Sequence, residues 1–104
     1  MKEIKLTVHP FEMGTEKEAA LKPLEEAAEA FAAFQGIDRC GGPEQCVRCE
    51  LMEACEAPIE LADEIADTIQ AACNLAARYD IDLGAAMERC ETRNRDRGRY
   101  PLSD

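Results

Sequence analysis

Alanine and other apolar residues recur at helical spacing through most of this chain, and this periodicity restricts its fold more than any other feature. Seventeen of the 104 residues are alanine, only five are aromatic and none is tryptophan. Small side chains let helices approach closely, but they fill only a thin core. A chain of this length is expected to form one domain with one modest core. We therefore predict a single all-α domain over residues 1–104.

Local signals mark the ends of a first helix. Thr15 is suited to cap it, and Glu18 follows three residues later, as in a capping box. Pro23 should kink this helix or restart it, because proline lacks the N–H that a helix interior uses. Gln35-Gly36 supplies a stop, since glycine is the usual residue just past a helix end.

Two further helices are expected after a cysteine-rich insert at residues 38–57, which should form a hairpin or a short helix of its own. Pro58 opens a long helix at its first turn, where the missing N–H costs least, and this helix should end near Tyr79. Asp82 can cap a last helix that finishes at Gly98. The predicted fold is a bundle of about four helices.

The N-terminal residues differ, because polar and apolar side chains alternate from Lys2 to Val8. Alternation of this kind is typical of an extended segment. We predict a short extended arm that lies on another part of the protein. His9, the only histidine, is expected at the surface.

The formal charge is −10, from 22 acidic and 12 basic residues. This balance argues against binding of a nucleic acid polymer or an anionic membrane surface. No segment has the apolar length of a signal peptide or a membrane span, so a cytoplasmic location is expected. The basic residues crowd the end of the chain, where they could face an anionic ligand: Arg89, Arg93, Arg95, Arg97 and Arg99.

Two carboxylate pairs have the spacing of one helix face. Glu26 and Glu29 stand three residues apart on the first helix, as do Glu64 and Asp67 on the long one. Two such pairs facing each other in a helical bundle could hold Mg²⁺, which prefers oxygen ligands. On spacing alone, a solvated acidic face is the simpler interpretation, because an acidic helical chain produces such pairs by chance.

Three segments in order nevertheless resemble one family. LEEAAEAF at Leu24–Phe31 is similar to an E-E-x-x-E motif, and EIADTIQAACNLAARYDIDL at Glu64–Leu83 is similar to an E-x-x-D motif with its downstream helix start. ETRNRDRGRYP at the end is similar to a C-terminal signature of asparagine and basic residues. Together, over about residues 15–101, they resemble the MazG-like all-α nucleoside triphosphate pyrophosphohydrolases.

The resemblance implies a Mg²⁺-dependent enzyme that hydrolyses a (deoxy)nucleoside triphosphate to the monophosphate and pyrophosphate. Metal ions would neutralise the polyphosphate and activate a water. The implied metal ligands are Glu26, Glu29, Glu64 and Asp67. Glu25 and Glu26 are the candidate catalytic residues, Glu25 as a further ligand or as the base. Asn94 and Arg97 match phosphate-binding positions, although Arg93 or Arg95 could take the same role. The alternative is an exposed basic helix end that only complements the helix macrodipole. Relatives complete their sites across subunits, so a homodimer or a dimer of dimers is expected.

The sequence departs from the family pattern at two points, and the first of them keeps an alternative open. Cys90 stands where relatives usually carry a lysine, four residues before Asn94, and 34 residues separate Glu29 from Glu64, which is longer than usual. The alternative is a catalytically idle helical module that binds a nucleotide or a protein. The preferred base and sugar are not specified by the sequence.

The cysteine-rich segment accounts for the extra length, and four cysteines lie in it. Cys40, Cys46, Cys49 and Cys55 form a C-x5-C-x2-C-x5-C pattern that could hold structural Zn²⁺ as a cap over the bundle. Disulfides or free thiols remain alternatives. A zinc-dependent interaction module is a third functional hypothesis. Cys73 and Cys90 fall on apolar helix faces and are expected to be buried thiols.

Overall fold

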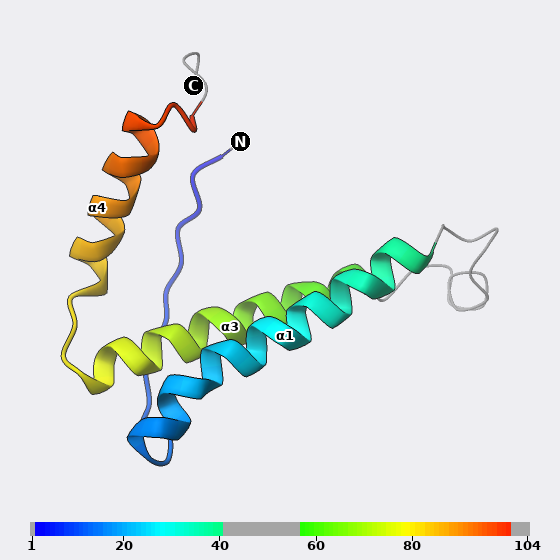
Figure 1. Cartoon of the computed structure of the whole chain (residues 1–104), viewed down its shortest axis with the longest axis horizontal. Coiled ribbons are helices and arrows are strands. Elements are labelled where there is room, and N and C mark those ends of the chain that lie inside the picture. The colour runs from blue at the N-terminus through cyan, green and yellow to red at the C-terminus, as the bar shows by residue number, and fades with distance from the viewer. Residues whose placement is uncertain (1, 41–56, 101–104) are drawn as a thin grey trace.

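The computed structural model describes residues 2–40 and 57–100, and within these residues it contains helices and no strand (Figure 1). Helix α1 spans Glu16–Cys40, α3 spans Ala57–Arg78 and α4 spans Leu83–Asp96. The antiparallel helices α1 and α3 pack along each other, and α4 turns away from the end of α3 (Figure 1). The predicted all-α class is confirmed. The fourth helix and most of the cysteine-rich insert were expected in residues that lie outside the described ranges.

Helix α1 begins where its cap predicts and ends later than expected. The Thr15 hydroxyl accepts a hydrogen bond from the Glu18 N–H at 3.2 Å. The helix then continues through Pro23 and through Gln35-Gly36 to Cys40. The predicted restart at Pro23 and the predicted stop at Gly36 were therefore wrong. Each residue weakens a helix locally, but packing along the length of α3 stabilises α1, and tertiary packing routinely overrides such propensities.

The signals for α3 and α4 were accurate. Pro58 is the second residue of α3, within its first turn. The Asp82 carboxylate caps α4 by accepting from the Ala85 N–H at 2.9 Å. Helix α4 ends at Asp96, and Gly98 adopts a left-handed conformation with φ of 69°, in which a side chain would be strained. Caps are local interactions, so the sequence alone is enough to place them.

The core is as thin as the composition predicts. The buried apolar residues of the described chain are three alanines, Ala19, Ala71 and Ala76. No residue of α4 is buried. Large apolar side chains on all three helices are exposed, among them Leu24, Phe31, Phe34, Ile59, Ile65 and Met87. One copy of the chain therefore leaves most of its large apolar side chains in contact with water.

The N-terminal arm docks through its last residues only. The Phe11 N–H donates to Asn74 Oδ1 at 2.9 Å, and Gln70 Nε2 donates to the His9 carbonyl at 3.1 Å. Of the apolar residues in the alternating segment, Ile4 and Leu6 are exposed and Val8 is half-buried. The arm lies on α3, as expected, and the backbone of His9 and Phe11 is hydrogen-bonded to side chains of that helix.

Candidate metal centre

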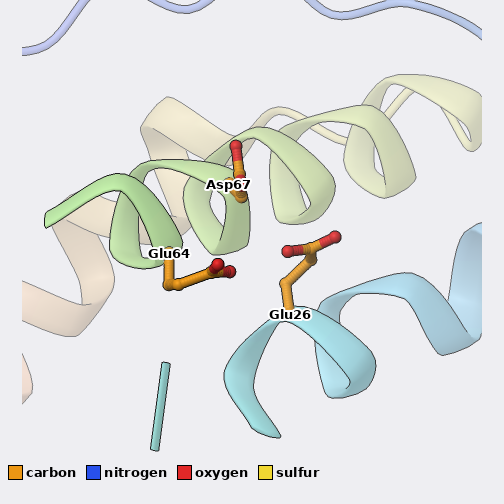
Figure 2. Close-up of side chains that lie close together, drawn as sticks. All are labelled: Glu26, Glu64 and Asp67. Carbon is orange, nitrogen blue, oxygen red and sulfur yellow. The ribbon is translucent and has the colours of Figure 1, made fainter. Parts of the chain in front are cut away.

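The α1–α3 pair brings three of the predicted metal ligands together. Glu26 on α1 and Glu64 and Asp67 on α3 each place a carboxylate oxygen within 4.8 Å of the others. Figure 2 shows the Glu26 side chain reaching from α1 across to the Glu64 side chain on α3. The pairing depends on the register of the two antiparallel helices, because Glu26 and Glu64 are 38 residues apart in sequence.

The burial of Glu26 distinguishes this cluster from an ordinary acidic surface, although Glu64 is half-buried and Asp67 is exposed. Glu26 is only 7% exposed, and its Oε2 atom is buried without a hydrogen-bond partner among the described residues. Glu64 Oε2 is also buried without a hydrogen-bond partner among the described residues. A buried carboxylate oxygen with no partner is costly, and buried charges are normally paired or coordinate a metal. The chemistry of this donor set, all oxygen and anionic, fits a hard divalent cation such as Mg²⁺.

Glu29, the fourth predicted ligand, is not one of the three clustered residues, but it lies close enough to interact with the carboxyls of Glu64 and Glu26. Its exposed carboxyl contacts that of Glu64, and this hydrogen-bonding contact, followed by the charge of Glu26, raises the pKa of Glu29 above its ordinary value. Like charges held together disfavour ionisation. A divalent cation among these carboxylates would relieve the same repulsion.

Lys22 is the residue at this site that the sequence analysis missed. Its ammonium lies 3.2 Å from Glu26 Oε1 and 3.6 Å from Glu25 Oε2. The spacing of four residues between Lys22 and Glu26 on one helix could have identified the pair. Lys22 neutralises one oxygen of Glu26, while Oε2 of the same carboxylate remains without a partner.

The candidate base Glu25 occupies a different setting from Glu26. Its side chain is largely exposed and contacts Lys22, and it is not one of the three clustered ligands. Successive residues of a helix point about 100° apart, so Glu25 and Glu26 cannot both face α3. Glu26 is accordingly the residue that lies in the cluster, and Glu25 lies beside it.

Asn94 and Arg97 are not brought to the carboxylates within this copy of the chain. Both belong to the end of α4, which projects away from the α1–α3 pair (Figure 1). Asn94 Nδ2 instead donates to Cys90 Sγ at 3.6 Å. The Tyr100 hydroxyl donates to Glu91 at 2.6 Å, which raises the pKa of Tyr100.

The cysteine predictions divide into two groups. Cys46, Cys49 and Cys55 lie outside the described residues, and Cys40 is described only as the last residue of α1, so the zinc hypothesis stays a prediction. Cys73 and Cys90 are free, half-buried thiols on α3 and α4. Their expected burial is therefore only partial.

The comparisons with known proteins add no evidence about the chemistry of this site. No family model, curated protein or solved structure matches this chain. Within residues 2–40 and 57–100, none of the helices combines the length and the apolarity that crossing a membrane requires.

Proposed function

We propose that this chain is a Mg²⁺-dependent nucleoside triphosphate pyrophosphohydrolase of the MazG-like kind, which cleaves its substrate between the α- and β-phosphates. The observation that carries the proposal is the pair of buried, unpartnered oxygens on Glu26 and Glu64. Both residues stand at motif positions that the resemblance assigns to metal binding. A solvated acidic face, the simpler interpretation of the spacing, does not account for a Glu26 side chain with so little exposure.

In this proposal Glu26, Glu64 and Asp67 hold the Mg²⁺, and Glu29 contributes from the edge. When bound, Mg²⁺ supplies charge neutralisation of the triphosphate and lowers the pKa of a coordinated water. Glu25 stands next to the ligands with an exposed carboxylate, where it can accept the proton of the attacking water. Lys22 must release Glu25 for that step, and it can do so while it stays paired with Glu26.

The proposal includes a second copy of the chain, as a homodimer or a dimer of dimers. Helix α4 has 14 residues and buries none of them. Isolated helices of this length are marginal in water, so α4 needs a surface to pack on. A second copy offers the exposed apolar side chains of α1 and α3, and it would bring its own Asn94 and Arg97 toward the carboxylates.

The decisive experiment measures pyrophosphate release from a panel of canonical and modified nucleoside triphosphates, with Mg²⁺ and with EDTA. Glu64→Gln removes a ligand charge and should lower Mg²⁺-dependent release by about a hundredfold or more. Asp63→Asn is the matched control, because Asp63 is the exposed neighbour of Glu64 on α3 and should leave release unchanged. Equal loss in both variants, or no release from any triphosphate by the wild type, would contradict the proposal.

The second candidate is the catalytically idle binding module. Cys90 supports it, because a thiol that contacts Asn94 stands where relatives carry a phosphate-binding lysine. Nucleotide binding without pyrophosphate release in any metal would favour this candidate. A zinc-dependent module would instead require zinc in the purified protein and no binding of Mg²⁺.

A further inference from the structure

A cavity of about 530 Å³ lies where the N-terminal arm meets the first turns of α1 and the last turns of α3. Its walls include two half-exposed aromatic rings, Phe11 and Tyr79, and one buried polar side chain, Asn74, which is only 4% exposed. Flat aromatic faces beside a polar group are typical of sites for planar ligands.

The cavity does not suit a phosphate group. The acidic residues Glu12 and Glu16 are among its lining residues, and the Arg78 guanidinium already donates to the Gly14 carbonyl at 3.2 Å. A phosphate would meet two negative charges and a single cation that is already bonded. A neutral ring is the better match.

The hydrogen bonds around Asn74 determine what its amide can offer. A backbone N–H can only donate, so the Asn74 atom that faces the Phe11 N–H must be the oxygen. Gln70 Nε2 donates to the same oxygen at 2.9 Å, which uses its second lone pair. The amide nitrogen, Nδ2, is buried and has no partner among the described residues. Asn74 therefore presents a donor and no free acceptor.

The cavity and the metal centre belong to one continuous stretch of the α1–α3 pair. Asn74 follows Asp67 by seven residues, and Ala19 of the cavity wall precedes Glu26 by seven. Seven residues make almost two helical turns, which return a side chain to the same face about 10 Å along the axis. A sugar and its 5′ linkage would bridge that separation, with a base at one end and phosphates at the other.

We propose that this cavity binds the nucleobase and that Asn74 Nδ2 donates to a carbonyl oxygen on the edge of the base that is farthest from the sugar. The inference rests on the proposed function. It selects bases with a distal keto group, such as uracil, thymine, hypoxanthine and guanine. Cytosine and adenine carry an amino group there, and two donors would face each other because the Asn74 oxygen has no lone pair left.

The test begins with binding alone. Uridine, inosine, cytidine and adenosine are titrated into the full chain in EDTA, and chemical shifts of the backbone amides of Phe11 and Asn74 are followed. Uridine and inosine should bind about tenfold to a hundredfold more tightly than the other two, which is the usual effect of leaving a buried donor unpaired. Asn74→Asp replaces the donor with an acceptor and should reverse the preference.

Phe11→Ala keeps the backbone N–H that orients Asn74, and it serves if Asn74→Asp does not fold. It should weaken binding of all four nucleosides about equally and keep the keto preference. Equal binding of the four by the wild type, or an unchanged order in Asn74→Asp, would overturn the inference. Keto-selective binding without any hydrolysis would support the inference and contradict the proposed enzymatic activity. Hydrolysis of all triphosphates at one rate, with no binding of nucleosides near Asn74, would overturn it and leave the enzyme standing.

Discussion

The α1–α3 pair and α4 are built from the same kind of sequence, yet they differ in what they bury. All are helices with recognisable start signals, and α4 has a complete cap at Asp82. Among the residues that the structure describes, α1 and α3 are the helices that enclose side chains between them, and Glu26 is the carboxylate that is buried there. Capping is enough to define a helix, whereas a site needs a second helix against it. The predictions below test this contrast.

The largest effect is expected when a variant of α4 and a variant of the α1–α3 pair are combined in one dimer. Arg97→Ala should lower kcat/KM about tenfold to a hundredfold through KM, because Arg97 would contact a phosphate. Glu64→Gln subunits are almost inactive in the proposal. Mixed after partial unfolding and refolding, the two variants should regain activity that neither has alone, since one site of each mixed dimer would be intact. Mixing without any gain would show that both residues act within one copy or that Arg97 has no role.

A smaller but structural effect is expected from the apolar side of α4. Met87→Asp places a charge on an exposed apolar position that a second copy should cover. Sedimentation should show a monomer, and circular dichroism should show a loss of helix. Glu88→Gln is the control on the neighbouring exposed residue. A wild type that sediments as a monomer would contradict the contrast between α4 and the α1–α3 pair, because α4 would then be stable with nothing packed on it.

Lys22 should have opposite effects on stability and on metal binding. In EDTA, Lys22→Met removes the only cation that contacts Glu26 among the described residues, so Tm should fall. Calorimetric titration should show tighter binding of Mg²⁺ or Mn²⁺, because the competing ammonium is gone. Lys17→Met, on an exposed part of α1, should change neither quantity. Weaker metal binding in Lys22→Met would mean that Lys22 orients Glu26 for the metal instead of competing with it.

The smallest effect concerns the pH dependence of stability. The Glu64 and Glu26 carboxyls raise the pKa of Glu29 above the ordinary 4.5, so the folded state binds the proton more tightly than the unfolded chain does. Stability from this group is therefore present at low pH and is lost as pH rises through the raised pKa. In EDTA, wild type and Glu29→Gln should have similar Tm values when the pH is near 4.5, the ordinary pKa of the group. At neutral pH the wild type should have the lower Tm.

Mg²⁺ provides the check on that result. A cation among the carboxylates should remove or reverse the difference in Tm between wild type and Glu29→Gln at neutral pH. A difference that is independent of both pH and Mg²⁺ would place Glu29 outside the metal centre.

Helix ends were predictable where one residue acts on its own neighbours. Thr15 and Asp82 bond backbone groups three residues away, and Gly98 has the conformation that its position at a helix end requires. Gly36 misled the prediction because its cost to a helix is small and the packing of α1 on α3 outweighs it. The local signal was present, but a long-range interaction decided the outcome.

The candidate site was predictable in composition and not in arrangement. Spacing together with the family resemblance pointed to Glu26, Glu29, Glu64 and Asp67, but neither could show that Glu26 is buried or that Glu25 is not. Lys22 and Asn74 were missed because each matters through a partner or a cavity that the sequence does not display. In the sequence, Asn74 is one polar residue among alanines, and only the structure shows that the arm lies over it.

By itself the sequence determined an all-α chain, the start of each described helix and the residues able to bind a metal. These follow from interactions within one or two helical turns. The tertiary structure decided which carboxylates lose their water, which amide nitrogen is left without an acceptor, and that α4 is separated from the site. Burial and the register between α1 and α3 are properties of two helices together, and no single stretch of sequence contains them.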